Sequence, residues 1–233
     1  MTTARERYIK LESNRYAFLN TAVECSELTI PYLIRHDNES KVNHKQLVQP
    51  WQSVGSSAVV TLAAKLMLAL LPPQTSFFKL QVKEDKLGEE ITPEIKTELD
   101  LSFSKMERTI MEAIAASNDR VVVHQALKHL IVGGNALIYM GKDGLKHYPL
   151  NRYVVTRDGN GNVIEIVTRE SVDKSLLNMQ QLERTPNDVS DTSAGDTDEV
   201  DIYTHVRYDN GRWRWHQECL DKVMDGTKGS APK

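Results

Sequence analysis

Apolar residues recur at helical spacing in the first part of the chain. From Thr3 to Thr29, five of them fall on one face when successive residues are placed 100° apart. This pattern predicts a single helix that ends before Pro31, because proline cannot continue a helix. Residues 36–49 are polar and indicate a loop or an extended arm. The shared face consists of Tyr8, Leu11, Phe18, Ala22 and Cys25.

A second helix is predicted over Ala58–Leu71, where nearly every position is apolar. A helix that is apolar on all sides must be covered over most of its surface, either by its own core or by neighbouring subunits. The run is too short for a bilayer, which needs about 20 apolar residues. We therefore expect a buried helix in which Leu66→Asp would cost several kcal/mol. Pro72 and Pro73 end it, and Phe77–Val82 reads as a short strand.

Two more helices follow with clear start and stop signals. Thr92 is a candidate N-cap, and Pro93 occupies the first helical position, where proline is favoured. A fourth helix over Arg120–Val132 ends at Gly133 and Gly134, as helices often do. The apolar face predicted for the third helix consists of Ile95, Leu99, Phe103, Met106, Ile110 and Ala113.

From Asn135 onward the alternation becomes strand-like. Asp-Gly and Asn-Gly pairs between the runs favour the positive φ angles of tight hairpins. A short helix over Val172–Leu182 is also predicted, and the tail from Asp225 shows no closing element. The predicted strand pairs are Ala136–Met140 with Leu145–Tyr148, Tyr153–Arg157 with Asn162–Thr168, and Val200–Arg207 with Arg212–Gln217, in which Trp213 and Trp215 share a face.

These elements predict an α+β fold in two regions. Residues 1–134 form a helical layer of about four helices, and residues 135–233 form small antiparallel β-hairpin units. Between Glu183 and Asp201, seven acidic residues and one arginine give a net charge of −6 and almost no apolar content. We interpret residues 183–199 as an acidic, flexible loop inside the β-rich region.

Composition narrows the possible function classes. The chain has 233 residues, of which 40% are apolar and 26% charged, so a packed core is possible and wholesale disorder is excluded. A net charge of −3 excludes a strongly basic protein that coats nucleic acid. Cys25 and Cys219 are far apart, which argues against a disulfide scaffold. The N-terminus resembles no secretory signal, so we expect a soluble, cytosolic protein.

The motifs for phosphate and calcium binding are near misses. Gly141-Lys142 fits the end of a phosphate-binding loop, but Ala136 replaces the first glycine and Asp143 follows the lysine. Asp158-x-Asn160-x-Asn162 resembles the start of a calcium loop, but Val163 and Arg169 replace its required glycine and glutamate. We therefore expect a hairpin turn at residues 158–161 and no ATP-driven motor.

The remaining polar residues assemble no catalytic set. His124 and His129 are five residues apart and do not share a helical face, and His205 is expected on the polar face of a strand. Cys25 is expected to be a buried, inert thiol. The sequence predicts no catalytic, cofactor-binding or metal-binding residue, and no enzyme. Four basic residues could touch DNA phosphates, although a solvated helix face is the simpler interpretation: Arg5, Arg7, Lys10 and Arg15.

Several motifs together carry a family resemblance across roughly residues 5–208. The chain resembles the portal proteins of short-tailed bacteriophages, the head-to-tail connectors of the Autographiviridae type. The matching motifs are Pro50-Trp51-Gln52-x-Val54-Gly55, Leu62-Ala63-x-Lys65-Leu66-Met67-Leu68-Ala69-Leu70-x-Pro72-x-Gln74-Thr75, Met106-Glu107-Arg108, Ala126-Leu127-Lys128, Gly134-Asn135-Ala136-Leu137-Ile138-Tyr139, Tyr153-Val154-Val155-x-Arg157-Asp158, Val167-Thr168-Arg169 and Asp201-Ile202-Tyr203-Thr204-His205.

The resemblance implies a subunit of a ring, usually a dodecamer, at one vertex of the virion capsid. Double-stranded DNA would pass through its channel during packaging and ejection. The implied partners are the major capsid protein, scaffolding protein, terminase, the tail adaptor and internal core proteins, with assembly in the host cytoplasm. No cofactor, metal or membrane contact is implied. The chain would correspond to the wing region, without the clip, stem and crown.

Two other function classes remain open on the residues alone. A helical adaptor that binds a protein partner would have the same exposed helical faces but would form no ring with a central hole. A nucleic-acid-processing enzyme would need an acidic metal-binding group, and the only acid-dense segment lies in the low-complexity stretch from Glu183 to Asp201.

Overall fold

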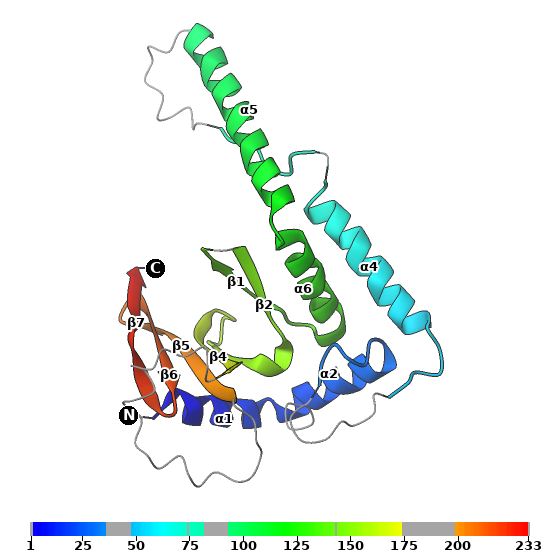
Figure 1. The fold of residues 1–233 in the computed structure, drawn as a ribbon, viewed down its shortest axis with the longest axis vertical. Coiled ribbons are helices and arrows are strands. Elements are labelled where there is room, and N and C mark those ends of the chain that lie inside the picture. Colours follow the sequence, from blue (N-terminus) through cyan, green and yellow to red (C-terminus); the bar gives the residue numbers. More distant parts are fainter. Residues whose placement is uncertain are drawn as a thin grey trace.

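The computed structural model describes residues 2–35, 48–73, 75–81, 93–142, 144–173 and 199–232. These residues form five α-helices and two antiparallel sheets, with every α-helix before the first strand (Figure 1). The predicted α+β class is therefore confirmed. The predicted residues 36–47, Val82, Thr92 and the acidic segment 183–198 lie outside the described ranges.

The first helical segment is two helices, α1 (Ala4–Asn14) and α2 (Tyr16–Leu28), so the prediction of one continuous helix is wrong. Thr3 and Glu6 form a reciprocal capping box at the start of α1. Arg15 leaves the helical conformation, with φ −100° and ψ 8°. This break rotates the second half, so that Leu19 is buried while Phe18 is 43% exposed.

Three further helices form the upper part of the molecule. They are α4 (Val54–Leu70), α5 (Pro93–Ala116) and α6 (Asp119–Gly133). As predicted, α6 ends at a glycine, since Gly134 adopts φ +70°. Helix α4 packs along α6, whereas α5 extends away from the body (Figure 1). The described residues Phe77–Gln81 form no strand, so that prediction is wrong.

The two-stranded sheet matches its prediction closely. Strand β1 (Leu137–Gly141) pairs antiparallel with β2 (Gly144–Tyr148). Asp119 Oδ1, at the start of α6, accepts a hydrogen bond from the backbone N–H of Leu145 at 2.8 Å. The hairpin is thereby fixed to α6, and the short 3₁₀ helix η2 (Leu150–Arg152) leads to the second sheet.

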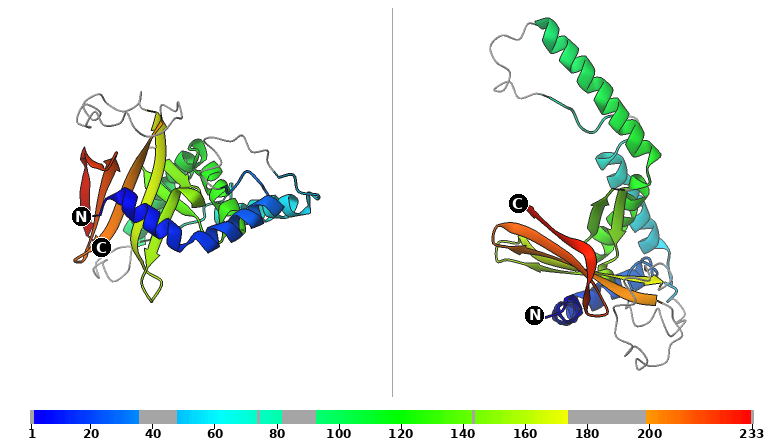
Figure 2. Two further views of the ribbon diagram at one scale, coloured as in Figure 1. Left: turned by 90° about the horizontal axis from the view of Figure 1, so that it is seen from below. Right: turned by 60° about the vertical axis from the view of Figure 1, so that its left-hand side comes forward.

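The second sheet has five antiparallel strands in chain order (Figure 2). The strands are β3 (Tyr153–Arg157), β4 (Val163–Asp173), β5 (Glu199–Asp209), β6 (Arg212–Cys219) and β7 (Lys222–Pro232). The two predicted hairpins are present, but they are not separate units, because β4 also pairs with β5 along nine residue pairs.

Three sequence-based boundaries in this sheet are wrong. Val172 and Asp173, predicted to begin a helix, belong to β4, and residues 174–182 lie outside the described ranges. Glu199, predicted to end the acidic loop, begins β5. The tail forms β7, which pairs with β6 from Cys219↔Lys222 to Arg212↔Pro232. Pairing with a neighbouring strand, rather than a local pattern, makes the tail extended.

Two apolar clusters hold the layers together. The first joins α2 to η2 and to β2, and consists of Leu19, Ala22, Val23, Ile34, Tyr148, Leu150 and Tyr153. The second lies where α1 crosses one face of the five-stranded sheet (Figure 2), and consists of Ala4, Tyr8, Val154, Val167 and Tyr203. None of the helices among the described residues is both long and apolar enough for a membrane span.

Candidate functional site

Helix α4 leaves most of its apolar surface uncovered. Only Val59 and Ala63 are buried, while Leu62, Leu68 and Leu70 are 46%, 62% and 53% exposed. Of the two ways in which this helix could be covered, by its own core or by neighbouring subunits, the first is therefore wrong for Ala58–Leu71. The reason is geometric: among the described elements, α4 has one main neighbour, α6, which covers a single narrow face. Leu66, expected in the core, is half-buried.

Helix α5 is still less covered. None of its described side chains is buried. Its 24 residues make a rod about 36 Å long. One hydrogen bond ties its middle to the preceding segment, from the backbone N–H of Leu80 to Glu107 Oε1 at 2.6 Å. Of the predicted apolar face, Leu99 and Phe103 are half-buried, whereas Ile95, Met106, Ile110 and Ala113 are exposed.

Such faces are suited to contact another protein surface. Fully burying one large aliphatic side chain stabilises a structure by about 1.5–3 kcal/mol. These side chains are roughly half exposed, so contact with a partner would still gain part of that free energy from each of them. In proteins, a helix gains most of its stability from packing its apolar face against other elements. Extended apolar surfaces on a folded chain mark interaction sites. The exposed faces of α4 and α5 together form what we call the helical contact face.

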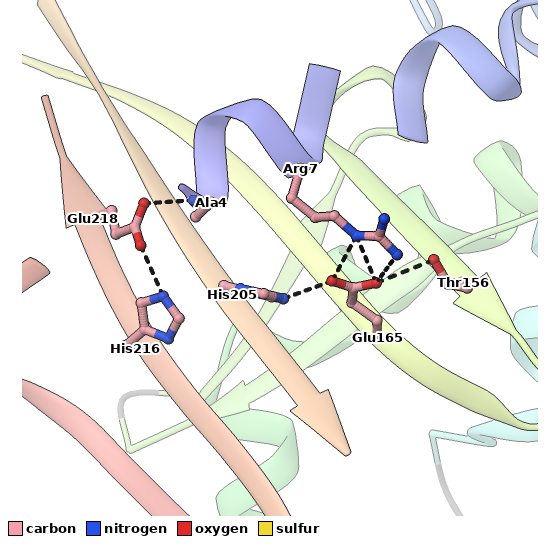
Figure 3. A network of polar contacts seen from close by, with 7 residues as sticks. All are labelled: Ala4, Arg7, Thr156, Glu165, His205, His216 and Glu218. Carbon is pink, nitrogen blue, oxygen red and sulfur yellow. Dashed lines mark hydrogen bonds and ion pairs between the residues drawn. The ribbon is translucent and has the colours of Figure 1, made fainter. Parts of the chain in front are cut away.

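A polar network on the opposite side of the molecule fixes α1 to the five-stranded sheet (Figure 3). Glu165 on β4 is 5% exposed and lies at its centre. Arg7 on α1 donates to this carboxylate through Nη2 at 2.6 Å and Nε at 3.0 Å. His205 Nε2 on β5 lies 2.8 Å from Glu165 Oε1, and Thr156 Oγ1 lies 3.4 Å from Oε2.

A second carboxylate in this network holds the start of α1. Glu218 Oε2 on β6 accepts a hydrogen bond from the backbone N–H of Ala4 at 2.5 Å. A carboxylate at this position complements the partial positive charge of a helix N-terminus. Its other oxygen lies 3.0 Å from His216 Nε2. The two histidines are direct neighbours across β5 and β6, with ring centroids 5.2 Å apart.

The network shifts the protonation of its members. Burial acts to raise the pKa of Glu165, but hydrogen bonds from Arg7 and His205 outweigh it and lower that pKa. Burial lowers the pKa of His205, and the hydrogen bond to Glu165 offsets only part of that effect. The hydrogen bond to Glu165 raises the pKa of Arg7. At neutral pH Glu165 is therefore ionised and bound to a permanent cation.

The basic residues of the first helical segment do not form one solvated face. Arg7 pairs with Glu165, and Arg5 lies 3.6 Å from Asp221. Arg15 packs over the Tyr153 ring at 5.9 Å, and burial lowers its pKa. Of the four residues considered for DNA contact, Lys10 is exposed, and within the described ranges its side chain makes no ion pair, hydrogen bond or ring contact.

The near-miss motifs occupy ordinary turns and strands. Asp158 Oδ1 accepts from the backbone N–H groups of Asn160 and Asn162, as predicted for a hairpin turn. Gly141 ends β1 and lies in no helix-capping loop. In the part of the chain that the structure describes, no three His, Cys, Asp or Glu side chains are grouped so as to hold a metal ion.

The histidines of α6 lie in different surroundings. His129 is 6% exposed and packs against His147 of β2, with ring centroids 4.3 Å apart. Burial lowers the pKa of His129 to about 4, and burial also lowers the pKa of His147. His129 Nδ1 and His147 Nε2 are buried without a hydrogen-bond partner. His124 is not part of this pair, in agreement with its predicted separation from His129.

Comparison with known proteins gives the family. A model described as bacteriophage head to tail connecting protein matches residues 1–221. The portal protein of Enterobacteria phage T3 is 37% identical over 245 residues, covering 98% of this chain and 43% of the relative. The portal protein of Escherichia phage T7 is 32% identical over 239 residues, covering 99% of this chain and 44% of the relative.

A third curated relative is also a portal protein. The portal protein of Enterobacteria phage SP6 is 32% identical over 221 residues, covering 91% of this chain and 41% of the relative. The chain thus spans about two fifths of the length of the curated relatives it matches. Since the family model covers nearly the whole sequence, the chain belongs to the bacteriophage head-to-tail connecting protein family.

Proposed function

We propose that this chain is the wing region of a portal subunit, and that the whole protein forms the ring at one capsid vertex through which viral DNA is packaged and ejected. Residues 1–134 make up the helical part of that wing, and residues 135–233 its β-rich part. Membership of the head-to-tail connecting family supports this assignment. The role is structural rather than catalytic, without cofactor or metal.

The observation that carries the proposal is the helical contact face. A ring closed by identical subunits needs two different faces on each copy, because each contact joins unlike surfaces. Exposed apolar side chains on both α4 and α5, such as Leu68 at 62% and Leu101 at 58%, supply surface for such contacts. A single chain gains little from keeping these side chains in water.

The polar network supports the same role from the other side of the molecule. Glu165 and Glu218 hold α1 against the sheet through Arg7 and the backbone of Ala4. A subunit in a ring transmits load between its neighbours. Because α1 is fixed at both ends of its first turn, it keeps the sheet and the helical layer in one orientation. The fold thus presents its contact faces on a rigid frame.

The partners follow from the proposed role. In the virion and during assembly in the host cytoplasm, the whole protein would contact the major capsid protein, scaffolding protein, terminase, tail adaptor and internal core proteins, with double-stranded DNA in the channel. We propose a dodecamer, the number implied by the resemblance to portal proteins.

Negative-stain electron microscopy of the purified protein tests the proposal. Rings with a central hole are expected, and they should disappear when Leu68 and Met106 on the helical contact face are both changed to aspartate. A chain that stays monomeric at all concentrations, or that forms only a one-to-one complex with another protein, would instead indicate a helical adaptor.

A further inference from the structure

One face of the five-stranded sheet carries a group of exposed cations. Helix α1 covers this face near Tyr203 and Glu218, but not near the turn between β5 and β6. The uncovered part carries four basic residues from three adjacent strands, which we call the basic face. They are Arg207, Arg212, Arg214 and Lys228.

Strand register places the four side chains on the same side. Arg207 is two residues from His205 on β5, so both point to the α1 side of the sheet. Arg214 is the direct cross-strand partner of Arg207, and Lys228 is that of His216. Arg212 follows the same alternation on β6, two residues from Arg214. All four residues are exposed.

Within the described residues, three of these cations make no ion pair, although carboxylates lie directly opposite Arg207 and Arg212 on the neighbouring strands. Arg214 pairs with Asp209 at 3.3 Å, whereas the side chains of Arg207, Arg212 and Lys228 make no hydrogen bond or ion pair there. The other acids on this face are already occupied. Glu165 is bound by Arg7, and Glu218 is bound by the N-terminus of α1 and by His216.

The acids directly opposite two of these cations are already paired with other residues, since Glu165 opposite Arg207 is bound by Arg7, and Asp209 opposite Arg212 is bound by Arg214. Like charges directly opposite each other on neighbouring strands destabilise a sheet, and Arg207 and Arg214 are such a pair. The chain as a whole has a net charge of −3, so the basic face is a local concentration of positive charge rather than a reflection of composition. Bound phosphate groups would relieve the repulsion.

We infer that the basic face binds the phosphate backbone of a nucleic acid, without reading its sequence. Guanidinium groups match the geometry of phosphate oxygens. Same-face residues on one strand are about 6.6 Å apart and adjacent strands about 4.8 Å apart, so the array offers several separate contacts to a polyanion. Binding of this kind depends on charge and releases counterions.

The neighbouring side chains favour nucleic acid over an acidic protein. Thr156, His216 and Ser230 flank the cations on the same face, and each is polar. Protein interfaces are anchored by buried aromatic and apolar side chains, and those of β6, Trp213 and Trp215, point to the other face of the sheet. The basic face thus offers charge without an apolar anchor.

Fluorescence anisotropy with a labelled DNA duplex of about 30 base pairs, at about 50 mM salt, tests the inference. The triple variant Arg207→Gln, Arg212→Gln and Lys228→Gln should weaken binding by at least about tenfold, and wild-type affinity should fall with salt with a logarithmic slope near about −3. The matched control carries the same charge change at exposed lysines elsewhere, Lys65→Gln, Lys79→Gln and Lys105→Gln. It should change binding by less than about twofold.

Three outcomes would overturn the inference: no DNA binding by the wild type, an equal loss in the control variant, or tighter binding to polyglutamate than to the duplex. The triple variant should unfold within a few degrees of the wild type, since its three substituted side chains are exposed and make no ion pair within the described residues. The inference concerns a single chain. If the protein forms rings but does not bind DNA, only the inference about the basic face is contradicted. If it binds DNA but forms no rings, only the proposed function is contradicted.

Discussion

Arg7 and Glu165, which are 158 residues apart in the sequence, form a forked ion pair between the first helix and the second strand of the large sheet. The carboxylate is almost fully buried, while the guanidinium is 30% exposed. Removing a buried charge from such a pair leaves its partner without compensation, whereas an exposed pair contributes little.

The first prediction concerns Glu165→Gln, which keeps the side-chain size but removes the charge. It should lower the free energy of unfolding by about 2 kcal/mol, because Arg7 and His205 lose an ionised acceptor. Urea denaturation measures this. The control is Glu112→Gln, whose exposed pair with Arg108 should contribute less than about 0.5 kcal/mol. Equal effects of the two substitutions would show that the network does not stabilise α1.

The second prediction is a loss of stability in mild acid through His129. Its pKa is about 4 in the folded chain and about 6.5 when unfolded, so between these values the unfolded state binds the extra proton. The contribution of His129 is therefore complete above pH 6.5 and decreases as the pH falls towards 4. Between pH 7.5 and 5, the wild type should lose about 2 kcal/mol from this group.

The variant His129→Leu separates this effect from the titration of other groups. It removes the ionisable ring and the buried Nδ1 atom without a hydrogen-bond partner, so its stability should fall less over the same pH interval. Chemical denaturation at each pH measures the difference. An identical pH dependence in the variant and the wild type would mean that His129 is not the group responsible.

The third prediction distinguishes assembly from folding on α4. Leu68 is 62% exposed and Ala63 is fully buried. Leu68→Asp should change the free energy of unfolding of the monomer by less than about 0.5 kcal/mol but abolish association. Ala63→Asp should cost more than about 3 kcal/mol, because it buries an unpaired charge. Light scattering and denaturation of both variants provide the test; association that survives Leu68→Asp would exclude α4 from the contact.

Much of the fold could be predicted, because hairpins and helix ends carry local signals. Gly134 ends α6 in the left-handed conformation, and Asp158 with its Asn-Gly neighbours forms the predicted turn. Strand β7 has no such signal. Lys222–Pro232 is rich in glycine and polar residues, and it becomes a strand because β6 offers it an edge, with Trp215 lying over Gly229.

The helical contact face and the polar network show what sequence periodicity cannot supply. The apolar run around Leu66 identified a helix that needs covering, but the pattern does not specify what covers it. Arg7, Glu165 and His205 are too distant in sequence for any spacing rule. One signal was present: Glu165 occupies an inward position between Val163 and Val167, where an apolar residue is expected.

The last prediction concerns the turn between β6 and β7. Leu220 and Asp221 both have positive φ angles, 49° and 61°, as a two-residue type I′ turn requires. Leucine is disfavoured in this conformation by about 1 kcal/mol, whereas asparagine tolerates it. The turn between β5 and β6 already has Asn210 and Gly211 at the equivalent positions.

Leu220→Asn should therefore raise the free energy of unfolding by about 0.5–1 kcal/mol. Leu220 is 37% exposed, so little apolar burial is lost, and Asp221 keeps its ion pair with Arg5. Leu220→Val is the matched control, since a β-branched side chain is still less compatible with positive φ and should destabilise the chain. Thermal and urea denaturation of the wild type and the two variants rank their stabilities. If Asn proves no more stable than Val, backbone strain does not limit this hairpin, and its stability comes instead from the pairing of β7 with β6.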